Sequence, residues 1–283
     1  PGGLNFKYKI ARALVFKKIH GRFGGRLQFV VSGGAPISKT LCEFFHSVGV
    51  LLLEGYGLTE TTSATHVNRP THYKFGTVGL PIDGVECKIA DDGEVLVRGD
   101  IILLGYYKNE KMTKEVLDSS GWFHTGDLGE IDSEGFLKIV DRKKDIIVTS
   151  AGKNVAPQKI ENALKTSVYI SQGMVFGDKR KFLSALISID EEKVKKWATN
   201  NKVEYKDLAD LSRKAEVKHL IDQEVDKVNK KLASFETIKK FNVLEEDFTM
   251  AAGEMTPSLK LKRAVIQKKH QKLIDQFYEE RYN

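Results

Sequence analysis

Two short apolar runs near the start of the chain, each followed by a glycine-rich segment, predict neighbouring strands of a sheet. Residues 27–31 (LQFVV) precede SGGAP, and residues 50–53 (VLLL) lead into EGYGLTETT. Such runs are typical of buried strands, and we expect a helix beginning at Pro36 to connect them. Its apolar face would carry Ile37, Leu41, Phe44, Phe45 and Val48. Ligands bind at the glycine-turn edge of open parallel sheets, so these two segments are candidates for a ligand site. Two strands cannot form a sheet alone. We therefore predict a partial α/β sheet whose other strands lie upstream or in another chain.

The pattern changes after residue 75 to short strands separated by frequent turns. Turn signals occur at DDG (residues 91–93), TGD (residues 125–127) and DSEG (residues 132–135). The apolar positions around them predict strands at residues 85–90, 93–98 and 136–140. They also predict one helix, at residues 109–117. We therefore expect residues 76–143 to form a small β-barrel or distorted sheet.

Charged amphipathic helices dominate the chain beyond residue 144. Helical periodicity predicts helices at residues 156–164, 191–199, 211–232 and 263–282, and apolar runs predict strands at residues 146–149, 173–176, 182–189 and 241–244. This combination is typical of a small α+β domain. The sequence thus predicts a multidomain chain, α/β and α+β in class, with three parts: residues 1–75, 76–143 and 144–283.

The charge of the chain favours an anionic ligand such as a nucleotide or a phosphorylated cofactor. The formal net charge is +7, and most of the positive excess lies after residue 144. Most of these lysines also fit an ordinary solvated surface. Nucleic acid would suit the same charge, but the sequence contains no recognition motif for it, so we expect no nucleic-acid partner.

Cysteine usage and hydropathy favour a cytoplasmic protein. Cys42 and Cys87 are isolated, which is typical of reduced thiols. No apolar run approaches the roughly 18 residues that cross a membrane, and residues 1–20 lack a signal-peptide pattern. Those residues predict a basic amphipathic helix that could touch a membrane surface, although a packed surface helix explains them better. We expect at most peripheral contact with a membrane.

The SGGAP and GYGLTE segments carry candidate ligand-binding groups. A flat base could lie against the backbone at Gly34, although an ordinary strand–helix turn explains SGGAP equally well. No Gly-Lys-Ser/Thr follows, so the segment is not a P-loop. In the second segment, Thr59 could donate to a phosphate oxygen, and Glu60 could hold Mg²⁺ beside the phosphates. The alternative is a helix N-terminus with Thr59 as its cap and Glu60 favoured by the dipole.

Two further segments carry ionic groups. Asp127 in the TGD turn could accept hydrogen bonds from two ribose hydroxyls, with Arg142 nearby. A simple turn and a surface arginine explain either residue alone. Lys260 and Lys262 lie in TPSLKLKR, just before the last predicted helix, and in isolation this is a basic surface loop.

Taken in order, five segments of the chain resemble the adenylate-forming ligase superfamily, and most closely its long-chain fatty-acid–CoA ligases (acyl-CoA synthetases). The segments are SGGAP, GYGLTET, GWFHTGD, DRKKDIIVTSAGKNVAPQKIE and TPSLK. Each is weak alone, but five in the family's order are specific, and they cover the chain from about Arg22 onward. The resemblance implies that a large domain and a mobile C-terminal domain use ATP to convert a fatty acid to its acyl-adenylate. CoA then displaces AMP to give acyl-CoA.

The resemblance also implies roles for single residues. Those that would bind ATP and Mg²⁺ are Gly34, Ala35 and Pro36 along the adenine, Tyr56 at its face, Thr59 at the α-phosphate, Glu60 at the Mg²⁺, and Asp127 with Arg142 at the ribose. Lys144 would be the hinge, and Gly152 would border the pantetheine path of CoA. Lys260 would bridge the substrate carboxylate and the α-phosphate during adenylation.

The sequence departs from the family's pattern in two places. The family's Ser-Gly-Lys is Ser258-Leu259-Lys260 here, so Lys262 is a competing candidate for the catalytic lysine. The Ser/Thr/Gly-rich phosphate loop is absent, and we expect it upstream of Pro1. We therefore interpret the chain as the C-terminal half of a long-chain ligase and expect it to be inactive in adenylation by itself.

Three alternatives stay open at this point. The chain could be a nucleotide- or CoA-binding fragment or subunit without activity of its own. It could belong to a ligase for medium-chain or aromatic acids. A homodimer formed through the missing N-terminal region is also compatible with the sequence.

Overall fold

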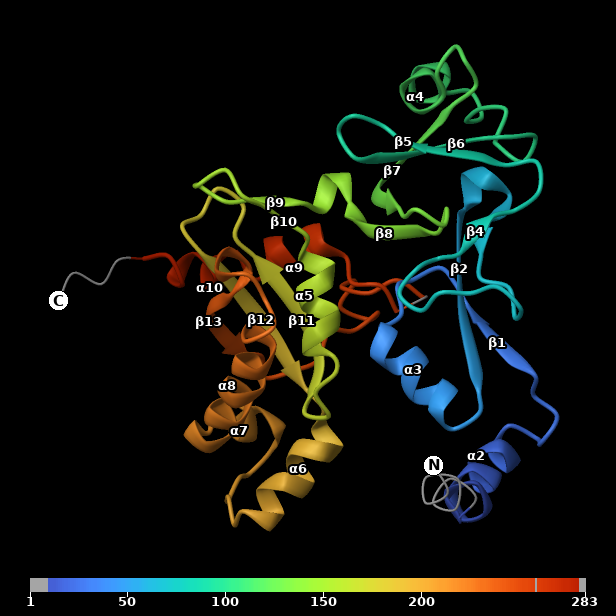
Figure 1. Ribbon diagram of the computed structural model, residues 1–283. Coiled ribbons are helices and arrows are strands. Elements are labelled where there is room, and N and C mark those ends of the chain that lie inside the picture. The colour runs from blue at the N-terminus through green and yellow to red at the C-terminus, as the bar shows by residue number, and fades with distance from the viewer. Residues whose placement is uncertain (1–9, 258, 280–283) are drawn as a thin grey trace. The chain divides into compact units, whose positions relative to one another are not determined.

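The computed structural model describes residues 10–257 and 259–279 (Figure 1). The chain divides into two compact units, Pro1–Lys143 and Lys144–Asn283, which we call the N-terminal and C-terminal units. The mixed α/β class predicted from the sequence is confirmed. None of the helices in the described residues combines the length and hydropathy that a membrane crossing requires.

The first sheet of the N-terminal unit has the strand order β1-β2-β3-β4. Its strands are β1 (Phe29–Ser32), β2 (Leu51–Leu58), β3 (Ser63–Val67) and β4 (Leu80–Pro81). The π-helical turn η1 (Arg12–Phe16) and α2 (Lys17–Arg22) precede them, and α3 (Lys39–Ser47) connects β1 to β2. The expected parallel pairing of β1 with β2 is confirmed, whereas β3 and β4 add antiparallel strands that the sequence pattern did not indicate.

Three expectations for this sheet are wrong. The second strand continues through Leu58, so the GYGL segment is strand and not a turn. The helix begins at Lys39 after an extended Ser38, because the amide of Ile37 donates to Glu54 Oε1 (3.2 Å) and holds that segment against β2. Finally, β1 is not buried: Phe29 is 40% and Val31 is 59% exposed, since within the described residues β1 pairs only with β2.

The second sheet of the N-terminal unit is antiparallel, with the order β5-β6-β7-β8. Its strands are β5 (Glu86–Ile89), β6 (Glu94–Arg98), β7 (Phe123–Ile131) and β8 (Leu137–Arg142), and α4 (Glu110–Val116) lies between β6 and β7. The sheet curls around a core formed by Val78, Val95, Val97, Phe123 and Leu137. The expected turn at residues 125–127 is wrong, because these residues lie inside β7 beside a register shift in its pairing with β6.

The C-terminal unit is built on a three-stranded sheet with the order β11-β12-β13. These strands are β11 (Ile170–Phe176), β12 (Leu183–Ile189) and β13 (Ile238–Val243), with β11 antiparallel and β13 parallel to β12. The short hairpin β9 (Ile147–Val148) and β10 (Asn154–Val155) precedes them. The helices are α5 (Pro157–Leu164), α6 (Glu191–Asn200), α7 (Leu208–Arg213), α8 (Ala215–Asn229), α9 (Arg263–Lys269) and α10 (Gln271–Gln276).

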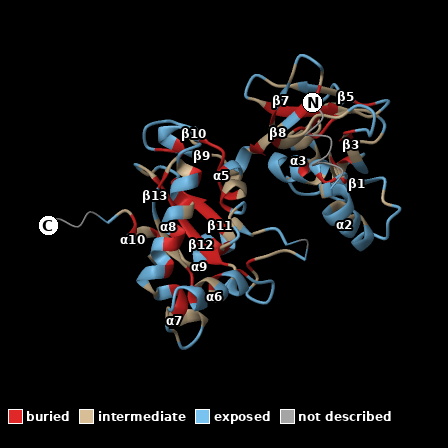
Figure 2. Cartoon of the chain, turned by 60° about the horizontal axis from the view of Figure 1, so that its bottom comes forward, coloured by how far each residue is buried: buried red, intermediate tan, exposed pale blue. Residues whose placement is uncertain are grey.

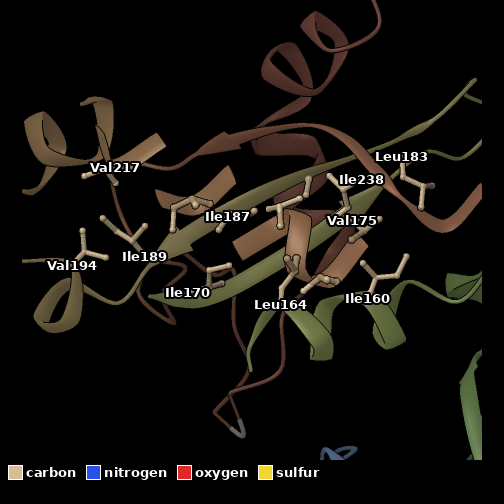
Figure 3. Packing of buried hydrophobic residues seen from close by; sticks show 14 of the residues in the cluster. Ile160, Leu164, Ile170, Val175, Leu183, Ile187, Ile189, Val194, Val217 and Ile238 are labelled. Carbon is tan, nitrogen blue, oxygen red and sulfur yellow. The ribbon is translucent and has the colours of Figure 1, made fainter. Parts of the chain in front are cut away.

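Side-chain alternation along β11 and β12 creates the two cores of this unit. Val175 and Ile187 project to one face, where they pack with residues of α5 and α8 such as Ile160 and Val217 (Figure 3). Met174 and Leu186 project to the other face, where they pack with Ile266 of α9 and with Ile274 and Phe277. Because both faces are covered, β12 is buried along its whole length (Figure 2).

Two predicted helices of this unit are interrupted. The helix predicted at residues 211–232 is two helices, because Lys214 between α7 and α8 is extended (φ −61°, ψ 138°). The helix predicted from residue 263 breaks at His270, and residues 280–282 lie outside the described residues. The three-residue helices η2 (Thr59–Thr61), η3 (Lys143–Asp145) and η4 (Ser234–Glu236) complete the chain.

Candidate functional site

Three of the predicted site residues meet in the N-terminal unit. Asp127 on β7 pairs directly with Arg142 on β8, and Arg142 Nε lies 3.2 Å from Asp127 Oδ1. The hydroxyl of Tyr56, from β2, donates to Asp127 Oδ2 at 2.6 Å. The Asp127 carboxylate is buried, whereas the Arg142 side chain is 42% exposed. These three residues, here called the Asp127 cluster, combine a fixed carboxylate with a guanidinium that solvent and ligands can reach.

The backbone around Asp127 is fixed by its neighbours. Thr125 Oγ1 donates to the carbonyl of Val95 (2.7 Å) and accepts from the Asp127 amide (3.1 Å). The amide of Gly126, at φ +71°, donates to Glu94 Oε1 (2.9 Å). These bonds hold the bulged part of β7, so the Asp127 carboxylate is preorganised before a ligand arrives.

Electrostatics keep the polar groups of this region in defined charge states. Burial, and then the adjacent Asp127 carboxylate, raise the pKa of Tyr56, so its phenol remains a neutral donor. Burial opposes ionisation of Glu94, but Lys143 Nζ at 3.0 Å and the Gly126 amide outweigh it and lower the Glu94 pKa. Glu94 is therefore an anionic anchor for the β7 backbone.

Thr59 and Glu60 follow β2 in the three-residue helix η2. Their alternative interpretation as a helix cap is wrong in detail, because Leu58 occupies the N-cap and the helix has a single turn. Glu60 Oε1 accepts a hydrogen bond from the Tyr106 hydroxyl (3.0 Å), and its carbonyl accepts from the Leu103 amide (2.8 Å). Thr59 is exposed. Glu60 thus presents a half-buried carboxylate whose orientation is set by Tyr106.

The residues expected beside the adenine lie in the exposed loop after β1. Gly34 has φ +79°, and a Cβ added there would meet no atom within 4 Å, so the glycine is required by backbone conformation and not by crowding. Ala35 and Pro36 are also exposed. The loop is tied to β2 through Glu54, whose pKa is raised to about 7 by burial against the opposing effect of the Ile37 amide.

The remaining predicted residues belong to the C-terminal unit. Lys144 is its first residue and is exposed. Gly152 lies in the β9–β10 turn at φ +72°, where its amide donates to the Thr149 carbonyl (2.8 Å) and a Cβ would meet no atom within 4 Å. Lys260 and Lys262 are both exposed, and Lys262 is the residue that caps α9.

Two family models match the chain over most of its length. The model for AMP-binding enzymes matches residues 6–107, and the model for the AMP-binding enzyme C-terminal domain matches residues 144–282. The chain belongs to the AMP-binding enzyme family.

Relatives of this AMP-binding enzyme chain include fatty-acid ligases. It is 42% identical over 276 residues to the long-chain-fatty-acid–CoA ligase FadD15 of Mycobacterium bovis, covering 97% of this chain and 46% of that protein. It is 36% identical over 285 residues to the peroxisomal long-chain acyl-CoA synthetase 6 of Arabidopsis thaliana, covering 94% of this chain and 41% of that protein. The chain spans about half the length of the curated relatives it matches.

The fold is shared with solved adenylation domains. The A-PCP didomain of the carboxylic acid reductase from Segniliparus rugosus, solved in complex with AMP, superposes with a TM-score of 0.74 at 26% identity, covering 95% of this chain and 37% of that one. The family resemblance seen in the sequence is therefore confirmed.

Sequence reasoning missed the groups that hold the site of this AMP-binding enzyme chain in place. Tyr106 contacts Glu60, and Glu94 contacts the backbone of β7, from positions far away in the sequence. Tyr106 lies 46 residues after Glu60, so no local pattern relates them. The nearest local signal is the start of α4, three residues after Tyr106, where Asn109 caps the helix and accepts from the Met112 amide (3.1 Å). This signal indicates the helix but not the contact between Tyr106 and Glu60.

Proposed function

We propose that this chain is the C-terminal half of a long-chain fatty-acid–CoA ligase, and that it supplies the ribose side of the nucleotide site and the mobile C-terminal domain. The observation that carries the proposal is the Asp127 cluster in a chain of the AMP-binding enzyme family. A buried carboxylate with a partly exposed guanidinium suits two vicinal ribose hydroxyls, because the carboxylate accepts and the guanidinium donates. The identity to long-chain ligases supports the choice of acid.

The reaction begins when a fatty-acid carboxylate attacks the α-phosphorus of ATP and expels pyrophosphate. Negative charge then gathers on the phosphoryl oxygens, so preorganised cations and donors stabilise the transition state. Thr59 would donate to an α-phosphate oxygen, and the ammonium of Lys260 would lie between that phosphate and the acid. The thiol of CoA then attacks the acyl carbonyl of the adenylate and expels AMP.

Glu60 would be the protein ligand of Mg²⁺. In the described residues, no group of three or more His, Cys, Asp or Glu side chains is arranged to hold a metal. A single carboxylate nevertheless fits Mg²⁺, which is commonly bound by one or two carboxylates together with substrate phosphates and water. When bound, Mg²⁺ would neutralise phosphate charge. Tyr106 would orient the Glu60 carboxylate that binds the ion.

The join between the units suits a hinge. Lys144 would be the pivot, since the two compact units meet in sequence at Lys143–Lys144. Gly152, which carries no side chain and has open space around it, would border the pantetheine arm of CoA. Because adenylation requires Lys260 and thioester formation does not, a rotation that withdraws the lysine would give each half-reaction its own arrangement.

Titration calorimetry of the chain with AMP tests the proposal. Asp127→Asn should weaken AMP binding by roughly 10- to 100-fold, because a hydrogen bond to a charged group contributes about 1.5–3 kcal/mol. Glu86→Gln is the matched control: Glu86 also lies opposite an arginine, Arg98, on neighbouring strands of the same sheet, at 2.6 Å. Equal AMP affinity of the wild type and Asp127→Asn would contradict the assignment.

A second candidate function is a nucleotide-binding subunit that pairs with a separate N-terminal chain. The exposed apolar side chains of β1 and α3 favour it, because Phe29, Val31 and Phe44 are 40%, 59% and 54% exposed. Co-purification of a second polypeptide with the chain from its own cell would support this candidate. Expression from one continuous reading frame with the missing half would exclude it.

A further inference from the structure

The segment that carries Lys260 is a closed hairpin. Met255 and Leu261 form an antiparallel bridge, and the amide of Lys262 donates to the carbonyl of Glu254 (2.7 Å). Nearer the tip, the Lys260 carbonyl accepts from the Thr256 amide (2.8 Å), and the Lys260 amide donates to Thr256 Oγ1 (3.0 Å). The backbone of Lys260 is therefore fixed relative to the stem, and the position of the stem decides where the lysine lies.

One side of the stem is anchored through Arg263, the first residue of α9. Its Nη2 lies 2.6 Å from Glu161 Oε1 on α5, and its Nη1 donates to the Val175 carbonyl on β11 (2.7 Å). Glu161 Oε1 also accepts from the Val175 amide (2.8 Å). The side chains of Arg263 and Glu161 are only 21% and 11% exposed. The guanidinium thus joins α9, α5 and β11 at one point, three residues after Lys260.

The other side of the stem is anchored through Glu254. Its side chain is 3% exposed and accepts from Lys269 Nζ (2.9 Å) on α9. It also lies within 3.4 Å of His270 Nε2 and accepts from the Thr249 amide (3.3 Å). Because Lys269 and His270 are at the end of α9 and Arg263 is at its beginning, both ends of this helix are bound to buried carboxylates.

We propose that two anchors are positioning residues for Lys260 in adenylation: the Arg263–Glu161 ion pair, and Glu254. This inference rests on the proposed function, in which the Lys260 ammonium contacts the acid and the α-phosphate. The ion pairs act through the stem: they hold the hairpin on the C-terminal unit, and the hydrogen bonds between Thr256 and Lys260 carry that position to the backbone of the lysine. A misplacement of about 1 Å in such a group can lower a rate by about 100-fold.

The experiment uses the full-length ligase that contains this chain and measures its two half-reactions separately. Adenylation is followed by ATP–pyrophosphate exchange, and thioester formation is followed from supplied acyl-adenylate and CoA. Lys260→Ala and Arg263→Met should each lower adenylation, the latter by roughly 10- to 100-fold, and both should leave thioester formation within about twofold. In a Lys260→Ala background, Arg263→Met should cause no further loss, because it has no lysine left to position.

Two further variants keep the test decisive. Lys159→Met breaks a comparable ion pair of α5, with Glu236 at 2.8 Å, that does not touch the hairpin, and it should leave both half-reactions unchanged. If Arg263→Met does not fold, Glu254→Gln is the milder substitution and should show the same selective, lysine-dependent loss.

The outcomes separate the two proposals. Undiminished adenylation by Lys260→Ala would overturn the role of that lysine in the proposed function. Loss with Lys260→Ala but not with Arg263→Met would overturn the positioning role alone. Equal loss in both half-reactions, or further loss in the Lys260→Ala background, would show that Arg263 only stabilises the fold and would also overturn it.

Discussion

Glu54 should make the stability of the N-terminal unit depend on pH, and Glu54→Gln should remove that dependence. Glu54 lies where β2 meets the SGGAP loop, and burial raises its pKa from 4.5 to about 7 although the Ile37 amide donates to it. An amide oxygen can still accept from Ile37. The substitution therefore keeps the tie between loop and strand and removes only the cost of ionising a poorly hydrated carboxylate.

The sign and size follow from proton linkage. Between pH 4.5 and about 7 the folded state keeps a proton on Glu54 that the unfolded state has released, so the free energy of unfolding falls as pH rises through this window. At 1.36 kcal/mol per pH unit the whole interval corresponds to about 3 kcal/mol, and partial solvation of Glu54 reduces this to about 2 kcal/mol. Glu54→Gln should thus stabilise the unit by about 2 kcal/mol more at pH 8 than at pH 4.

The two tryptophans make the assay specific for one unit. Trp122 lies in the N-terminal unit and Trp197 in the C-terminal unit, so a Trp197→Phe background leaves Trp122 as the reporter of urea unfolding. Glu43→Gln on α3 is the control. Glu43 is exposed and its ion pair with Lys39 is long, at 3.7 Å, so its removal should change the free energy of unfolding little at either pH. A Glu54→Gln effect of the same size at both pH values, or destabilisation at pH 8, would refute the reasoning.

Two further predictions concern single contacts in the proposed site. Tyr106→Phe removes the hydroxyl that donates to Glu60 at 3.0 Å. The Mg²⁺ concentration that gives half-maximal ATP–pyrophosphate exchange by the full-length ligase should therefore rise about tenfold. An unchanged Mg²⁺ requirement would contradict the proposed orientation of Glu60. Leu259→Gly should stabilise the C-terminal unit by about 0.5–1 kcal/mol in thermal unfolding. A leucine at φ +61° costs about 1–2 kcal/mol of backbone strain, which glycine relieves. The larger conformational entropy that glycine gives the unfolded chain offsets part of this stabilisation. Destabilisation by Leu259→Gly would show that its side chain, 62% exposed, contributes packing.

The elements that the sequence predicted well are those whose signals are local. Helix α5 begins at Pro157, the first helical position that proline favours, and ends where the apolar spacing ends at Leu164. Strand β12 is predicted at residues 182–189 and spans Leu183–Ile189, because an apolar run of that length, interrupted only by Ser184 and Ser188, fits a strand covered on both faces. The five short segments in the family's order identify the family without reference to the contacts that they make.

Two of the errors occurred where glycine has a purpose other than a turn. Gly57 was assigned to a turn, but it lies in β2, where a Cβ would come 1.8 Å from the carbonyl oxygen of Ser63 on β3. The glycine is there because two backbones approach closely, which a strand also requires. Gly126 is similar: its positive φ belongs to the bulged part of β7 and brings its amide to Glu94. Single-sequence patterns do not distinguish these cases from turns, because they do not show which backbone will lie against the glycine.

The hairpin of Lys260 shows how local strain and distant contacts depend on each other. Leu259 holds a left-handed conformation where the family pattern has glycine, and a strained residue persists only where the surrounding structure over-determines it. The bonds across the stem and the ion pair between Arg263 and Glu161, 102 residues apart, provide that restraint. The leucine is visible in the sequence as a departure from the family, but its tolerance is explained only by the anchoring contacts. The same contacts that allow the departure are those that would hold Lys260 for catalysis.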